Sequence, residues 1–167
     1  FWAEVEAQGG GNSGYARNGR LQPIADDHAL NLARQREITA LDLWRDNAHW
    51  KVIKADDAPW SPLTPSGWLI HDTLSALIHP RQACAALAAA LRAIGIEVVP
   101  EAEQSGLTLW ATGAPGLDEM TAQHHRSMGG GVKGQAASLD FDARGSAQLF
   151  AGGVHIIPHS DGTVAVG

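Results

Sequence analysis

The sequence predicts an α/β fold, α+β overall, and three observations support this prediction. Apolar residues recur at helical spacing in two segments, 26–44 and 80–94. Gly95 ends the second segment and a short β-branched run follows at 96–99, which is the order of elements typical of an α/β layer. Residues 154–167 instead contain two strand-like runs around a turn. Helix-and-sheet layers and antiparallel strands are therefore both expected.

The two predicted helices have clear boundary signals. Asp26 or Asp27 is a good starting residue for the first helix, which we expect to reach about Trp44. Pro80 suits the first position of the second helix because it has no backbone N–H to leave unpaired. Gly95 then supplies the stop, since glycine readily takes the left-handed conformation that ends many helices.

Strands and loops are predicted for most of the remaining chain. Residues 1–7 include an alternating run that enters a glycine-rich loop at 9–14, so we expect a short strand there. Residues 46–80 are rich in proline and tryptophan, which fits short strands and turns better than a helix. A further strand is expected at 107–111, and the polar residues 120–127 are expected to form a loop.

The segment 154–167 carries the strongest local pattern. Its apolar runs flank Asp161–Gly162, a pair that can take the positive backbone angles of a tight hairpin turn. One hairpin alone is marginally stable in water, and the sequence ends directly after it. We therefore expect the chain to be a piece of a larger protein.

Segments with an α/β pattern alternate with β-rich segments along the sequence, and this alternation predicts two lobes. One lobe is expected from residues 1–45 and 80–117, which carry the α/β pattern. The other is expected from residues 46–79 and 118–167, which are β-rich. Each lobe would then be assembled from two separate segments.

Composition narrows the possible functions. The chain has 12 basic and 18 acidic residues and no basic cluster, so nucleic acid is not an expected partner. Its longest apolar run is far shorter than the roughly 20 residues of a membrane span. Cys84 is the single cysteine, which excludes an internal disulfide and fits a reducing cytoplasm. Its alanine-rich surroundings predict a small buried thiol in a soluble protein.

The first chemical signal is Glu6 followed by the glycine-rich loop. A carboxylate just past a strand of a nucleotide-binding sheet can accept hydrogen bonds from ribose hydroxyls. The loop from Gly9 to Gly14 can present a nest of backbone N–H groups that suits a pyrophosphate. Taken alone, both features also fit a solvated glutamate and a flexible turn.

Five segments, in order, resemble the FAD-dependent oxidoreductases of the D-amino-acid oxidase and glycine oxidase type. Residues 5–23 resemble the second strand and flavin-contact loop of that family, with an acidic residue, a glycine-rich turn, Ser13 and a closing Pro23. Residues 80–99 resemble the family's helix before a short strand, and residues 109–114 resemble its strand entering the second FAD loop. Residues 133–135 read Lys-Gly-Gln in place of the usual Arg-Gly-Gln. Residues 154–167 resemble the family's strand, proline, turn and strand unit.

The resemblance implies a partial Rossmann-like FAD-binding lobe beside an antiparallel, β-rich substrate lobe. It places the adenosine ribose at Glu6, the pyrophosphate at Asn12 and Ser13, and the flavin ring beside Asn18, Gly19 and Arg20. The far side of the cofactor would be lined by Thr112 and Gly113. His155 falls where the family places a tyrosine that meets the substrate carboxylate.

The implied reaction is the oxidation of a small amine or amino acid, with a hydride passing from the substrate Cα to the flavin. The protein would then supply orientation and a dry pocket, so no catalytic side chain can be named from the sequence. The Gly-x-Gly-x-x-Gly unit and the C-terminal segment of the family are not in the sequence, and this predicts a central fragment that binds FAD weakly and is inactive in isolation. The sequence does not indicate an oligomeric state.

Two alternatives remain open. The first is an inactive, truncated relative that serves as a binding or structural module. The second is a metal-dependent hydrolase that uses His124 and His125, or His71, Asp72 and His79. No established metal-binding spacing supports the second reading, so no metal ligand is predicted.

Overall fold

The computed structural model describes residues 1–103 and 105–167. It confirms the predicted α/β class, because helices accompany a mixed seven-stranded sheet. The chain divides into two compact units, one formed by residues 1–97 and 136–167 and the other by residues 98–135. The predicted lobes, which pair other segments, stay a prediction.

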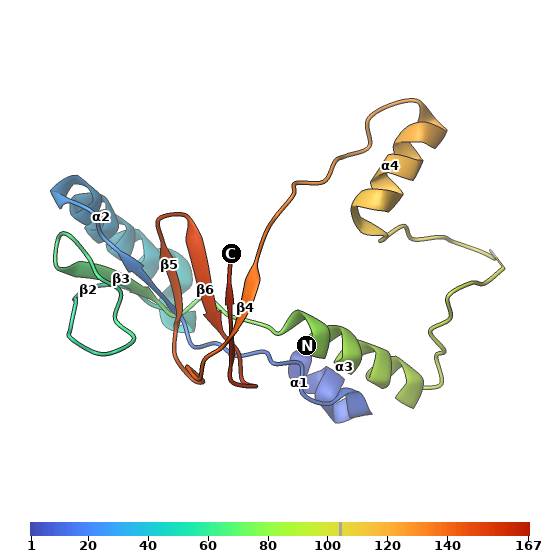
Figure 1. The fold of residues 1–167 in the computed structure, drawn as a ribbon, viewed down its shortest axis with the longest axis horizontal. Helices are drawn as coiled ribbons and strands as arrows, with labels where there is room; N and C mark the ends of the chain where they lie inside the picture. Colours follow the sequence, from blue (N-terminus) through green and yellow to red (C-terminus); the bar gives the residue numbers. More distant parts are fainter. Residues whose placement is uncertain (104) are drawn as a thin grey trace. The chain divides into compact units, whose positions relative to one another are not determined.

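The sheet lies in the first unit and has the strand order β2-β3-β1-β5-β6-β7-β4 (Figure 1). Neighbouring strands are antiparallel except β1 and β5, which are parallel. The strands are β1 (Arg20–Pro23), β2 (Trp50–Lys54), β3 (Trp68–Asp72), β4 (Ala137–Asp140), β5 (Gln148–Ala151), β6 (Val154–Pro158) and β7 (Thr163–Val166). The strands and turns expected around residues 46–80 are thus present as β2 and β3.

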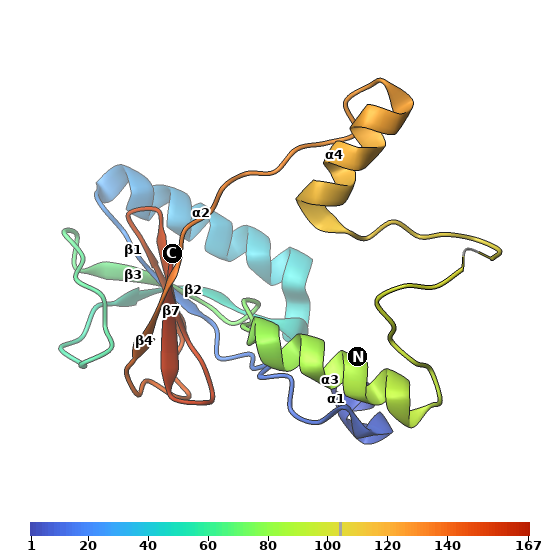
Figure 2. The same ribbon diagram turned by 45° about the vertical axis from the view of Figure 1, so that its right-hand side comes forward.

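Helix α2 (Asp27–Trp44) confirms the first predicted helix and is followed by the short 3-10 helix η2 (Arg45–Asn47). The Asp26 side chain caps it by accepting a hydrogen bond from the Ala29 N–H at 2.8 Å. Leu30 and Ala33 of α2 are buried in one core cluster with Ile24 and Ile70. The helix therefore covers the sheet at the end that carries β2 and β3 (Figure 2).

Helix α3 (Pro80–Ala93) confirms the second predicted helix, with Pro80 in its first turn. Helix α1 (Trp2–Val5) and the π-helical turn η1 (Glu6–Gly10) pack against it, so the predicted strand over residues 1–7 is wrong. Val5 is buried with Ala86 and Ala90, whose small side chains allow the two helices to approach closely. Burial of Val5 against a helix thus replaces the partner strand that a β-segment would need.

The face of α3 that packs inward carries alanines, and this changes the expectation for Cys84. The buried residues of α3 are Ala83, Ala86 and Ala90, which are spaced by three and four. Cys84 lies one position away from this face and is exposed. The prediction of a buried thiol is therefore wrong.

The C-terminal hairpin is confirmed. Strands β6 and β7 pair antiparallel, with Ile157 opposite Ala165. The His159 N–H donates to the Thr163 carbonyl at 2.8 Å and closes the turn. Gly162 has a φ of 89°, the left-handed conformation expected of the glycine in this turn.

The second unit contains helix α4 (Gly113–His124). Neither strand predicted beside it forms, because residues 96–99 and 107–111 have no strand partner in the part of the chain that the structure describes. Leu109, for example, is 91% exposed. The prediction of a loop at 120–127 is also partly wrong, since the first half of this segment completes α4.

Candidate functional site

The flavin-contact residues predicted from the sequence lie at the start of β1. Gly19 has a φ of 77°, and its carbonyl accepts a hydrogen bond from the Gln148 N–H at 3.0 Å. A Cβ at this position would lie 2.5 Å from the Asp72 carbonyl oxygen. Glycine is therefore required here both by the backbone conformation and by the approach of β3. Asn18 is fixed to the neighbouring segment because its Nδ2 donates to the Ser146 carbonyl at 3.5 Å.

Arg20 is held by a buried carboxylate. Its Nε donates to Oδ2 of Asp72 at 3.1 Å, and Asp72 is 1% exposed. The other oxygen of Asp72 accepts a hydrogen bond from the Ser75 N–H at 2.8 Å. Arg20 and Asp72 are directly opposite each other in the β1–β3 ladder. The pairing of β1 with β3 and the ion pair with Asp72 together fix the Nε end of the Arg20 guanidinium group.

Phe150 connects Arg20 to His155, the residue predicted to contact the substrate. The guanidinium carbon of Arg20 lies 5.9 Å from the centre of the Phe150 ring. The rings of Phe150 and His155 are 4.5 Å apart, and the two residues are opposite each other in the β5–β6 ladder. Strand register therefore places Arg20, Phe150 and His155 on one face of the sheet. We call these three residues and Asp72 the Arg20 cluster.

The predicted pyrophosphate loop packs against the first turn of α3. Asn12 Oδ1 accepts a hydrogen bond from the Gly14 N–H at 2.8 Å, and Ser13 Oγ accepts one from the Tyr15 N–H at 3.3 Å. Ser13 is buried and shapes the loop, whereas Asn12 is exposed. Gly14 has a φ of 69°, and a Cβ there would lie 2.6 Å from the Cβ of His79. The loop is thus held tightly in place on α3.

His79, His159 and Asp161 line a cleft of about 500 Å³ between α3 and the sheet edge formed by β7 and β4. Nε2 of His79 lies 3.2 Å from Oδ2 of Asp161, and the rings of the two histidines are 4.7 Å apart. Burial and the neighbouring His79 lower the pKa of His159 below its ordinary value of 6.5, against the opposing effect of Asp161. Hydrogen bonds from Thr163 lower the pKa of Asp161.

The remaining predicted site residues lie elsewhere. Glu6 is an exposed residue of η1 rather than the end of a strand, and its contact with ribose stays a prediction. Thr112 and Gly113 belong to the second unit, at the start of α4. There the Thr112 side chain lies so close to Gly116 that a Cβ at Gly116 would collide with it. The structure therefore brings together Asn18, Gly19, Arg20 and His155, but not Glu6 with them.

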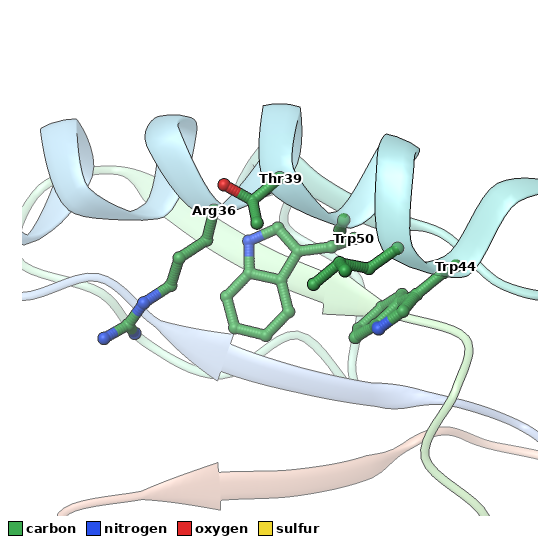
Figure 3. A pocket seen from close by; sticks show the side chains of 6 residues that line it. Arg36, Thr39, Trp44 and Trp50 are labelled. Atoms are coloured by element: carbon green, nitrogen blue, oxygen red, sulfur yellow. The ribbon is translucent and has the colours of Figure 1, made fainter.

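A smaller pocket of about 220 Å³ lies between α2 and β2 and contains none of the predicted residues. Its lining includes Arg36, Thr39, Trp44 and Trp50 (Figure 3). The indole rings of Trp44 and Trp50 meet edge to face at 6.1 Å, and the Trp50 Nε1–H donates to the Ala33 carbonyl at 3.2 Å. These contacts are those of a helix packed on a sheet.

Sequence reasoning missed Asp72 and Phe150 as members of the site. The sequence indicates Asp72 only as a possible metal ligand, whereas its carboxylate is bound to Arg20 and Ser75. The signal for Asp72 in the sequence is an acidic residue at the end of an apolar strand, since a carboxylate buried there requires a hydrogen-bonding or charged partner.

Among the described residues, no group of three or more histidine, cysteine, aspartate or glutamate side chains is arranged to hold a metal ion. Within the same part of the chain, no helix combines the length and apolarity needed to cross a bilayer.

Comparisons with known proteins give a fold relationship. No protein-family profile matches the sequence, and no curated protein matches it at a significant level. The structure is similar to an L-amino acid deaminase from Proteus myxofaciens in complex with anthranilate, with 18% identity and a TM-score of 0.55. It is also similar to the L-amino acid deaminase from Proteus vulgaris, with 14% identity and a TM-score of 0.60, and to a form of that enzyme lacking its specific insertion sequence, with 15% identity and a TM-score of 0.63.

The similarity covers 99% of this chain in all three comparisons. It covers 43%, 45% and 50% of the three deaminase chains. The chain therefore spans half or less of the length of the solved structures that it matches, and shares their fold over that span.

Proposed function

We propose that this chain forms part of an FAD-dependent oxidoreductase that oxidises a small amine or amino acid. The observation that carries the proposal is the Arg20 cluster, in which Phe150 contacts both the predicted flavin-side residue Arg20 and the predicted substrate-side residue His155. These residues come from strands that are distant in sequence. The fold shared with L-amino acid deaminases supports the same class of reaction.

The donor groups of the first unit fit a flavin dinucleotide. Gly11 has a φ of 74° and open space where a Cβ would stand, so its backbone is accessible to a phosphate. Asn12 next to it presents an exposed side-chain amide, while Ser13 holds the loop. Asn12 would bind the pyrophosphate, and Asn18, Gly19 and Arg20 would lie beside the ring system. FAD, when bound, supplies the hydride acceptor.

The contribution of the protein to this reaction is orientation. His155 is exposed, and its backbone exchanges two hydrogen bonds with Gly167, at 2.7 and 3.0 Å, which fixes the strand that carries it. A neutral imidazole there can donate one N–H to a substrate carboxylate. Phe150 covers one side of this position with an apolar ring, which excludes water from part of the site.

The proposal can be tested by titrating FAD and its parts into the isotope-labelled chain and following backbone amide signals by NMR. FAD should shift the signals of the loop 11–14 and of residues 18–20. Riboflavin should shift 18–20 alone, and ADP should shift 11–14 alone, because each carries only one half of the cofactor. This measurement also detects weak binding. If all three compounds leave both segments unchanged, the chain is better explained as a non-catalytic module.

A second test concerns the substrate side. In the active flavoprotein, His155→Ala should raise the KM for the substrate, with a smaller effect on kcat, because a ground-state contact is lost. His124→Ala should leave the KM unchanged, since His124 lies in the exposed end of α4. An unchanged KM in the His155 variant would remove that residue from the site.

A further inference from the structure

His159 is a buried histidine at the point where the C-terminal hairpin meets the first turn of α3. We propose that His159, His79 and Asp161 form a pH-sensitive latch between the β6–β7 turn and the loop 11–14, and that the latch opens when His159 takes up a proton. The inference rests on the proposed function and deepens it, because it makes binding of the phosphate half of the cofactor dependent on pH. We call these three residues the latch.

The latch contacts both of the segments that it couples. A Cβ at Gly14 would lie 2.6 Å from the Cβ of His79, so the loop 11–14 packs directly on this histidine. Nε2 of His79 lies 3.2 Å from Oδ2 of Asp161, and the His79 ring is 4.7 Å from the His159 ring. His79 therefore lies between the loop and the turn. Movement of the turn away from α3 removes two of the side chains that hold His79 in place.

His159 is the member of the latch that cannot carry a charge where it stands. It is 5% exposed, and within residues 1–103 and 105–167 its Nδ1 is buried without a hydrogen-bond partner. A neutral imidazole with its proton on Nε2 leaves only a lone pair at this nitrogen, whereas protonation adds a buried N–H donor that has no acceptor. Such a donor on a charged ring is costly to bury. Protonation of His159 therefore favours release of the ring to solvent.

The charges around His159 act in the same direction. Burial and the neighbouring His79 lower the pKa of His159, and Asp161 opposes them. Arg81 lines the same cleft and adds a further positive charge. A proton on His79 is balanced at its contact with Asp161, whereas a second proton on His159 must share the same carboxylate. Three more charged groups near the turn are exposed, so solvent screens them: Asp140, Asp142 and Arg144.

The latch is closed above the ordinary pKa of His159, 6.5, and opens progressively as the pH falls below that value. Opening removes the support of the loop 11–14 through His79. A ligand must then order the loop when it binds. The affinity for the phosphate half of the cofactor should therefore fall by roughly threefold to tenfold when the latch opens.

The first test follows the latch without any ligand. In the isotope-labelled chain, the nuclear Overhauser contact between the rings of His79 and His159 should be present at about pH 7.5 and weaken strongly at about pH 5. The contact between Ile157 and Ala165, across β6 and β7, should persist at both values and show that the hairpin is still folded. Persistence of the His79–His159 contact at the lower pH would overturn the inference.

Variants assign the effect to His159. In His159→Gln, residue 159 takes up no proton in this range, so its contact with His79 should remain at both pH values. His28→Gln is the matched control, because His28 is an exposed histidine of the same unit, and this variant should lose the contact as the native chain does. Loss of the contact in His159→Gln at low pH would show that another group opens the latch and would contradict the assignment.

The second test measures the coupling to the loop by titrating ADP and following the amide signals of residues 11–14. A phosphate itself takes up a proton near about pH 6, so the native chain and His159→Gln are compared at each pH. The two should bind ADP equally at about pH 7.5, and His159→Gln should bind it roughly threefold to tenfold more tightly at about pH 5. Equal affinities at the lower pH would contradict the coupling.

The outcomes distinguish this inference from the function on which it rests. If ADP shifts the loop 11–14 but the His79–His159 contact persists at low pH, the latch fails and the flavin function stands. If ADP shifts the loop at neither pH, the proposed function fails, and with it the role of the latch in cofactor binding. The Overhauser contacts still decide in that case whether His159 opens the turn.

Discussion

Nε2 of His79 lies 3.2 Å from Oδ2 of Asp161 and joins the first turn of α3 to the β6–β7 turn. Nδ1 of His79 accepts a hydrogen bond from the Gln82 N–H at 3.4 Å, so the proton of a neutral His79 belongs on Nε2, the nitrogen that lies beside Asp161. One imidazole therefore caps α3 with one nitrogen and contacts the β6–β7 turn with the other.

The stability of the chain should fall with acidification through the ordinary pKa of His159. His159 has a lowered pKa in the folded state, so around pH 6 the unfolded state binds more protons than the folded one. Its contribution is complete above about pH 6.5 and is lost progressively as the pH falls below that value. Thermal unfolding at about pH 7.5 and about pH 5.5 should show this loss. His159→Gln should reduce the difference in Tm between the two, and the exposed-residue variant His124→Gln should keep it.

Asp161 should stabilise the hairpin through all its partners together. Its Oδ1 accepts hydrogen bonds from the Thr163 N–H at 3.0 Å and the Thr163 hydroxyl at 2.7 Å, in addition to the His79 contact through Oδ2. Asp161→Ala removes every one of these and should lower the Tm by about 2–4 °C. Asp161→Asn keeps an acceptor oxygen and should lower it less. Asp57→Ala, at an exposed loop position, is the control; an equal drop there would show that the effect is not specific.

The exposed pair Asp142–Arg144 should be visible as a shifted titration. Hydrogen bonds from the Arg144 side chain and backbone lower the pKa of Asp142 from 3.8 to about 2. NMR titration of the Asp142 carboxyl carbon should therefore give a midpoint near this lower value. Arg144→Gln should return it toward 3.8, and added salt should raise it in the native chain because the pair is open to solvent. A midpoint near 3.8 in the native chain would contradict the structure.

The parts of the fold that could be predicted from sequence are those fixed by neighbouring residues. The start of α2 at Asp27, the proline at the start of α3 and the Gly162 turn all depend on local backbone chemistry, and each is confirmed. Residues 96–99 and 107–111 have equally strong local strand signals. They form no strand because β-structure also requires a partner strand, which local sequence does not report.

The candidate site shows the same limit at the level of side chains. Gly19 and His155 could be found from a motif, since each lies within a short segment of distinctive sequence. The contacts of Arg20 with Asp72 and Phe150 depend on how β1 pairs with β3 and with β5. No periodicity in the sequence fixes that strand order, so the residues that hold Arg20 could be identified only from the structure.

Gly19 should be far less tolerant of substitution than another glycine with the same backbone conformation. Gly19 and Gly67 have φ values of 77° and 75°, so alanine at either position costs about 1–2 kcal/mol in backbone strain. A Cβ at Gly67 would meet nothing within 4 Å, whereas one at Gly19 would lie 2.5 Å from the Asp72 carbonyl oxygen and 3.1 Å from Nε2 of His71. Gly19→Ala should therefore lower the free energy of unfolding by roughly 3–5 kcal/mol in urea, because β1 must also move away from β3. It should also disturb the Arg20 Nε–H signal, since residue 20 follows directly, and a bulkier residue should abolish the response of residues 18–20 to riboflavin. Equal losses of stability in Gly19→Ala and Gly67→Ala would mean that the close approach to Asp72 does not constrain β1.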